Sequence, residues 1–140
     1  MAGFIVLEDG RAYAANNFGF RATVAAIAGA LPHSAEGMAL SQWLLDESGV
    51  VQTYLNVDVR ELASATKETF LTATVNAYAI QKELGSNGWE SSEFWQSWIN
   101  RFADLVRMIE CVKRSESPNE FNPHMDGLIP PTSERVGPGW

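Results

Sequence analysis

The sequence contains a single cysteine, Cys111, among 140 residues. One cysteine excludes a disulfide within the chain, so an apolar core must hold the fold together. Hydrophobic residues make up 46% of the sequence and charged residues 19%, which is the composition of a folded globular protein and not of a disordered chain. A chain of this length is expected to form one domain.

Long apolar runs are also missing. No stretch approaches the roughly 20 apolar residues that a helix needs to cross a bilayer. The first apolar run stops at Glu8 and has no basic residues before it, so it lacks the pattern of a secretory signal. We therefore expect no membrane association and a cytoplasmic location, with which the scarcity of cysteine agrees.

Basic residues are few, with 10 lysines and arginines against 17 acidic side chains and a net charge of −7. This balance argues against a protein that binds nucleic acid or an anionic membrane, because both need clustered basic residues. Two stretches, 22–59 and 83–100, contain no lysine or arginine. They hold the carboxylates Glu36, Asp46, Glu47, Asp58, Glu83, Glu90 and Glu93. This placement predicts acidic surfaces suited to a basic partner.

The side chains of common catalytic and metal sites are scarce. The two histidines are His33, in an expected interhelix loop, and His124. The run from His124 to Asp126 could supply half of a metal site, but no second histidine or cysteine stands at ligand spacing. The phosphate-binding patterns G-x-x-x-x-G-K and G-x-G-x-x-G do not occur. We expect no metal, no cofactor and no enzymatic activity, with a converging pair among the 17 acids left open.

The pattern of apolar residues predicts an α+β fold. Residues 4–15 are expected to form a hairpin, because Asp9-Gly10 is a strong signal for a two-residue turn. That turn would pair Glu8 with Arg11 and place Tyr13 on the opposite face from Ile5. Residues 50–57 alternate between apolar and polar side chains, which predicts a strand. We expect the hairpin and this strand to form a small antiparallel sheet.

Three to four helices are expected to pack against that sheet. The predicted helices span 21–31, 34–47, 58–84 and about 91–114. Asp58 is the clearest predicted helix start, because Glu61 follows it at capping-box spacing. Residues 1–114 would then form a single α+β domain.

The composition changes after residue 114. Five of the six prolines fall between Pro118 and Pro138, without helical or strand periodicity. We expect 115–140 to be an extended segment that packs on the domain or on a partner. Its candidate anchors are Phe121, Leu128, Ile129 and Trp140.

A resemblance to a known class of proteins covers about residues 43–112. The quoted features are the segment 54–62 (YLNVDVREL), with Phe70 after it, and Trp89-Glu90 ahead of Phe94-Trp95 and the run to Glu110. This region resembles the small cytoplasmic immunity proteins of bacterial polymorphic toxin systems, of the contact-dependent, type VI or Rhs class. The resemblance implies a small acidic protein that binds a toxin domain and blocks its active site.

Trp89 lies in the polar loop 86–92, where no core requires an indole. An exposed aromatic residue beside carboxylates is typical of an interface hot spot. We predict that a protein partner with a basic surface binds Glu36, Asp46, Glu47, Trp89, Glu90 and Glu93. In the alternative interpretation these acids are ordinary solvated helix ends and Trp89 packs on the third predicted helix, 58–84.

The leading hypothesis is therefore a non-catalytic protein-binding inhibitor, namely an immunity protein that neutralises a cognate toxin by direct binding. A secretion chaperone or adaptor, or a phage-type inhibitor protein, would share the same features. Two further alternatives are a homodimer with a purely structural role and a small enzyme that uses His124 and Asp126.

Overall fold

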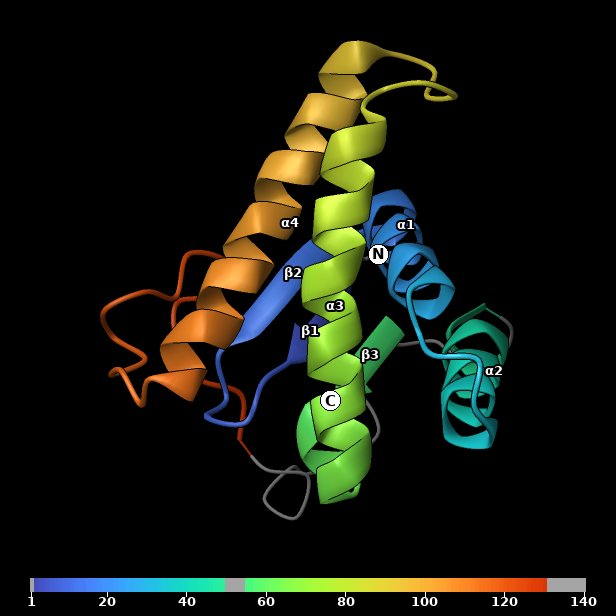
Figure 1. The fold of residues 1–140 in the computed structure, drawn as a ribbon. Helices are drawn as coiled ribbons and strands as arrows, with labels where there is room; N and C mark the ends of the chain where they lie inside the picture. The colour runs from blue at the N-terminus through green and yellow to red at the C-terminus, as the bar shows by residue number, and fades with distance from the viewer. Residues whose placement is uncertain (1, 50–54, 131–140) are drawn as a thin grey trace.

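The computed structural model describes residues 2–49 and 55–130. Within these ranges the α+β class is confirmed, with a three-stranded sheet and four α-helices (Figure 1). The elements in chain order are β1 (Ala2–Val6), β2 (Ala12–Asn16), α1 (Asn17–Gly29), α2 (Ala35–Gly49), β3 (Leu55–Asp58), a 3₁₀ turn (Val59–Glu61), α3 (Ser64–Leu84) and α4 (Ser92–Lys113). No helix in the described ranges is both long enough and apolar enough to cross a membrane.

The sheet has the strand order β2-β1-β3 and is mixed, not antiparallel throughout. β1 pairs with β2 in antiparallel orientation, but with β3 in parallel orientation, with Ile5 opposite Val57. The prediction of a wholly antiparallel sheet is therefore wrong for β3. The reason is the connection: β3 follows α1 and α2, and a crossover of that length lets a strand return to the sheet in parallel orientation. Residues 50–54 of the predicted strand lie outside the described residues.

The hairpin turn lies at the predicted place but is one residue longer than predicted. The Leu7 amide donates to the Arg11 carbonyl at 2.9 Å, which leaves Glu8 to Gly10 as a three-residue loop. Gly10 has a φ of 94°, which glycine adopts at little cost. The predicted pair of Glu8 with Arg11 is wrong, and Tyr13 lies opposite Ile5. A shift of one residue exchanges the two faces of a strand, so Tyr13 joins the core beside Ile5.

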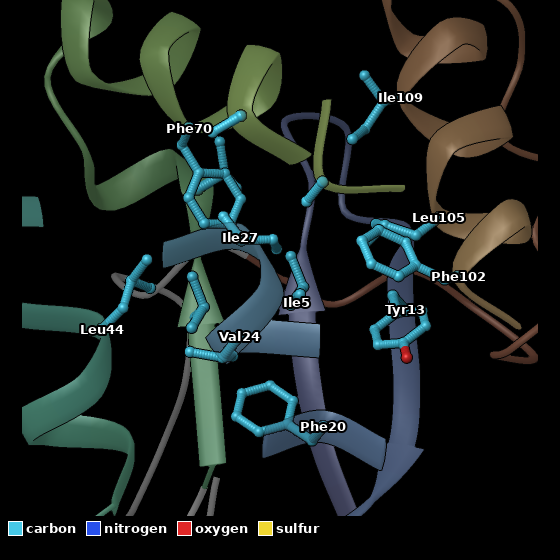
Figure 2. Close-up of a cluster of buried hydrophobic side chains, with 14 of the residues drawn as sticks. Ile5, Tyr13, Phe20, Val24, Ile27, Leu44, Phe70, Phe102, Leu105 and Ile109 are labelled. Atoms are coloured by element: carbon cyan, nitrogen blue, oxygen red, sulfur yellow. The ribbon is translucent and has the colours of Figure 1, made fainter. Parts of the chain in front are cut away.

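One face of the sheet packs against the helices. Figure 2 shows Ile5 and Tyr13 of the sheet among apolar side chains from α1, α3 and α4. α3 and α4 lie side by side across this face (Figure 1). The labelled helical members of this core are Phe20, Val24, Ile27, Leu44, Phe70, Phe102, Leu105 and Ile109.

Two helices start at places other than those predicted. Asp58 caps the 3₁₀ turn by accepting the Arg60 amide at 3.0 Å, and α3 begins only at Ser64. α1 begins at Asn17, four residues before the predicted start, because the Asn16 side chain accepts the Gly19 amide at 2.8 Å. Each capping side chain stabilises only the first turn after it, because it bonds to amides of that turn. It does not determine how long the helix is.

The other face of the sheet is covered by the segment 115–130, which packs on its own domain. Ile129 lies against Val6 and Ala12, with Met125 beside them. The Ile129 amide also donates to the Gly10 carbonyl at 2.8 Å. The anchor Trp140 and the rest of 131–140 lie outside the described residues.

Arg11 joins this segment to the hairpin. Its side chain is fully buried, and its guanidinium pairs with the Asp9 carboxylate at 2.8 Å. The remaining donors reach two backbone carbonyls of the segment, those of Phe121 and Glu116, each at 2.9 Å. The planar fork of arginine can satisfy three acceptors at once, which a lysine ammonium at the same place would match poorly.

His124 makes a further link between the segment and the sheet. Its Nδ1 accepts the Ala14 amide at 3.2 Å, so the ring proton lies on Nε2, which faces Asp104 Oδ2 at 3.0 Å. Arg60 holds the end of the segment by donating to the Ile129 carbonyl at 2.9 Å and the Pro130 carbonyl at 3.0 Å.

Replacement of Arg11 by alanine should destabilise the fold by about 3 kcal/mol, because two buried carbonyls and a partly buried carboxylate lose their donor. The measurement is urea unfolding followed by tryptophan fluorescence. Arg21→Ala is the control, since Arg21 is exposed on α1, and should change stability by no more than about 0.5 kcal/mol. Equal effects of the two substitutions would contradict the role given to Arg11.

Stability should also fall below about pH 6.5 through His124. Burial lowers the pKa of His124, outweighing its hydrogen bond to Asp104, which raises it. The unfolded chain therefore binds the proton at a higher pH than the folded chain, and between these two pKa values acidification favours unfolding. Protonated Nδ1 also could not accept the Ala14 amide. Urea unfolding at pH 7.5, 6.5 and 5.5 should show this loss.

His124→Gln is the matched control, because an amide can accept at one atom and donate at the other but does not titrate. The drop in stability across that pH range should be smaller in His124→Gln than in the unmodified chain. Identical pH profiles would remove His124 as the cause.

Candidate functional site

An open cleft of about 580 Å³ lies between the start of α1, the loop that joins α3 to α4, and the first turns of α4. We call it the aromatic cleft, and the side chains that define it are Tyr13, Phe18, Trp89, Phe94, Trp98 and Arg101. Its volume is within the range of pockets that hold small ligands or single side chains of a partner.

Two phenylalanines border the cleft in exposed positions. Phe18 in the first turn of α1 is 68% exposed, and Phe94 in the first turn of α4 is 61% exposed. Phe94 is held there because Ser91 caps α4 by accepting the Glu93 and Phe94 amides, both at 3.1 Å. Each ring therefore lies in the first turn of a helix whose N-terminus is capped by a side chain, Asn16 for α1 and Ser91 for α4.

Trp89 forms a wall of the cleft. Its ring stacks on Trp98 with the centroids 4.8 Å apart, and it meets the Phe18 ring edge to face at 5.7 Å. The alternative interpretation placed Trp89 on the third predicted helix, 58–84, but the ring contacts of Trp89 in the structure are with Trp98 of α4 and Phe18 of α1. The side chain nevertheless remains partly exposed, so it both packs and contributes to the cleft surface.

Thr23, a fully buried threonine of α1, hydrogen-bonds to two of the residues that line the cleft. Its hydroxyl donates to the Gly19 carbonyl at 2.9 Å, so it must accept from the Trp98 indole at 3.0 Å and from the Tyr13 hydroxyl at 2.8 Å. Burial raises the pKa of Tyr13, which keeps the phenol protonated and able to donate. One hydroxyl group therefore orients both the tyrosine and the tryptophan beneath the cleft.

Arg101 is the charged side chain among the residues that line the cleft. Glu90 and Glu93 follow Trp89 and precede Phe94 directly in the chain, and both are exposed. Neither carboxylate takes part in an ion pair with another described residue. Arg101 lies two turns further along α4, where its Nε donates to the Ala14 carbonyl at 2.6 Å.

The six residues predicted to bind a partner do not form one surface. Trp89, Glu90 and Glu93 lie together at the α3–α4 loop, whereas Glu36 lies on α2, where its carboxylate accepts the Thr69 hydroxyl at 3.2 Å. Figure 1 shows α2 well apart from the α3–α4 loop. Asp46 and Glu47 also belong to α2, but their side chains lie outside the described part of the structure.

Sequence reasoning missed Phe18 and Phe94 as members of the site. Phe18 lies in the polar run Asn16–Gly19, so it carries the same signal that singled out Trp89, an aromatic residue without an apolar periodicity around it. Phe94 precedes the buried Trp98 by four residues, a spacing that places both side chains on one side of a helix. Its exposure depends on where the neighbouring elements end, which helical spacing does not report.

The histidine considered for catalysis is used for packing. His124 pairs with Asp104 on α4, whereas Asp126 is exposed. In the described ranges no group of three or more histidine, cysteine, aspartate or glutamate side chains is placed to hold a metal ion. The chemistry that the aromatic cleft offers is recognition, through its aromatic rings and the guanidinium of Arg101.

Thr23→Val should leave the Trp98 indole and the Tyr13 hydroxyl without a buried partner and destabilise the fold by about 2 to 3 kcal/mol. Thr23→Ser is the matched control, because it keeps the hydroxyl and loses only a methyl group. Urea unfolding gives the stabilities, and near-ultraviolet circular dichroism reports the packing of the tryptophans. A valine variant as stable as the serine variant would show that this network does not support the cleft.

Comparison with known proteins does not assign the chain to a family: no family model matches it, and neither the curated proteins nor the solved structures contain a match.

Proposed function

We propose that this chain is a non-catalytic protein-binding inhibitor, an immunity protein that neutralises a cognate bacterial toxin in the cytoplasm by direct binding. The observation that carries the proposal is the aromatic cleft, which is lined by the exposed Phe18 and Phe94 and the partly buried Trp89. The resemblance of residues 43–112 to immunity proteins supplies the class of partner.

Exposed aromatic rings on rigid elements are costly unless a partner covers them. Each square ångström of apolar surface removed from water stabilises by about 25 cal/mol, so a partner that buries both phenylalanines gains several kcal/mol. Clustered exposed apolar residues mark interaction surfaces, and aromatic residues dominate the binding energy of such surfaces. The cleft therefore provides affinity.

The acidic side chains provide the preference for a basic partner. Glu90 and Glu93 adjoin the cleft residues Trp89 and Phe94 in the sequence, and the chain as a whole has a net charge of −7. Opposite charges on two proteins accelerate their encounter and disfavour wrong partners, while contributing less to affinity. Glu36, Asp46 and Glu47, which belong to α2, contribute to this long-range attraction.

The test is binding to the protein encoded by the neighbouring gene, expressed as an inactive variant and measured by surface plasmon resonance, with inhibition of the active toxin measured alongside. The double variant Phe18→Ala and Phe94→Ala should weaken binding by at least about tenfold. The control is Met38→Ala with Leu45→Ala, two apolar residues of α2 that are 65% and 50% exposed. Glu90→Gln with Glu93→Gln should lower the association rate and its dependence on salt.

The outcomes separate the parts of the proposal. Loss of binding in the α2 variant but not in the cleft variant would show that the cleft is not the contact surface. Binding without inhibition would indicate an adaptor or chaperone in place of an immunity protein. Absence of any complex with the neighbouring gene product would contradict the proposed function.

A further inference from the structure

We propose that Arg101 and His124 seal the free edge of the sheet at β2, and that acid opens the half of this seal formed by His124. The inference concerns a conformational device in the fold and goes beyond the proposed function, on which it does not depend. The device consists of one backbone position, Ala14, and the two side chains that bond to it.

β2 lies at one edge of the sheet, and in the described part of the chain no strand pairs with its outer side. In an antiparallel pair the backbone groups of alternate residues face away from the partner strand. Leu7 and Arg11 form a hydrogen-bonded pair, as does the pair of Ile5 with Tyr13 two residues further along. The N–H and C=O groups of Ala14 therefore face outward from the sheet.

An outward-facing strand position needs cover because it can pair with a strand of another chain. The sequence of β2, AYAAN, contains none of the lysines or prolines that commonly protect an edge strand. Ala12 is fully buried and packs against Ile129, and Asn16 ends the strand as the cap of α1. Ala14, which is partly exposed, is therefore the position of this edge that other elements must cover.

Two side chains from different parts of the chain satisfy Ala14. Arg101 of α4 donates from Nε to the Ala14 carbonyl at 2.6 Å, and His124 of the segment 115–130 accepts the Ala14 amide at Nδ1 at 3.2 Å. His124 also donates from Nε2 to Asp104 of α4 at 3.0 Å. The histidine ring thus joins β2 to α4 across the edge, and a strand from outside can bond to Ala14 only by displacing both side chains.

Only the His124 half of the seal titrates near neutral pH, because arginine stays charged. Three charged or titratable groups face His124: Asp104 and Arg101 from α4, and Tyr13 from β2, whose ring centroid is 5.4 Å away. Burial lowers the pKa of His124, the hydrogen bond to Asp104 raises it, and the charge of Arg101 lowers it. Burial raises the pKa of Tyr13, so its phenol is neutral in this range.

A proton on Nδ1 turns the acceptor for Ala14 into a donor. Two N–H groups then face each other and this contact is lost, whereas Nε2 keeps its bond to Asp104 and gains an opposite charge. A ring released from Ala14 regains water and titrates near about pH 6.5, above the buried ring. Between these two pKa values acid favours the open form, while Arg101 still holds the carbonyl half.

The test is hydrogen exchange of backbone amides, measured by ¹H–¹⁵N NMR on the whole chain and expressed as protection relative to an unfolded peptide. Tyr13 is the internal reference, because its amide lies inside the pairing of β2 with β1. From pH 7.5 to pH 5.5 the protection of Ala14 should fall by at least about threefold more than that of Tyr13. In His124→Gln, whose amide oxygen accepts but does not titrate, the protection of Ala14 should follow that of Tyr13.

A second pair of variants tests the half of the seal that Arg101 forms. Arg101→Met keeps an aliphatic stem and loses the donor, so the ¹³C signal of the Ala14 carbonyl should move upfield at both pH values. The matched control is Arg21→Met, an exposed position of α1, which should leave that signal unchanged. Circular dichroism confirms that each variant is folded.

Three results would overturn the inference. The first is an equal loss of protection at Ala14 and Tyr13, which would indicate that acid opens the whole sheet. The second is the same pH dependence of Ala14 in His124→Gln as in the unmodified chain. The third is an Ala14 carbonyl signal that does not move in Arg101→Met. No partner takes part in these measurements, so their failure leaves the proposed function untouched.

Discussion

The fold depends on the buried guanidinium of Arg11. A charged group without solvent needs all its donors satisfied, and Arg11 finds them in Asp9 beside it and in the carbonyls of Glu116 and Phe121. This requirement places the proline-rich segment against the sheet, where Ile129 can cover Val6 and Ala12. The sheet is thereby covered on both faces, and the helices on the other face keep the positions that form the aromatic cleft.

Local sequence patterns predicted the helices and strands well, but predicted their boundaries, turns and pairing poorly. Asp9-Gly10 marked the hairpin turn, but whether two or three residues form the loop depends on which amide bonds to the Arg11 carbonyl, and both loops suit the same residues. Asp58 was recognised as a cap, yet it caps a 3₁₀ turn, because its carboxylate also pairs with Arg60. The parallel pairing of β3 follows from a crossover that alternation along a single strand cannot reveal.

Only the part of the aromatic cleft whose residues are close in the sequence could be predicted. Trp89 with Glu90 and Glu93 is local in the sequence, and the structure keeps these residues together. Phe18 comes from more than 70 positions earlier, and its contact with Trp89 exists only because α1 packs beside the α3–α4 hairpin. The burial of Arg11 was equally hidden, since its acceptors are backbone carbonyls, which every residue type carries.

The position of β1 in the middle of the sheet has a consequence for how the chain folds. β1 precedes its parallel partner β3 by about 50 residues, and the carbonyls that accept from Arg11 lie 105 and 110 residues after it. Contacts so distant in sequence close late, after most of the chain entropy has been lost. During synthesis one edge of the hairpin therefore stays unpaired until β3 emerges, and the face of the sheet opposite the helices stays uncovered until residues 116–129 have left the ribosome.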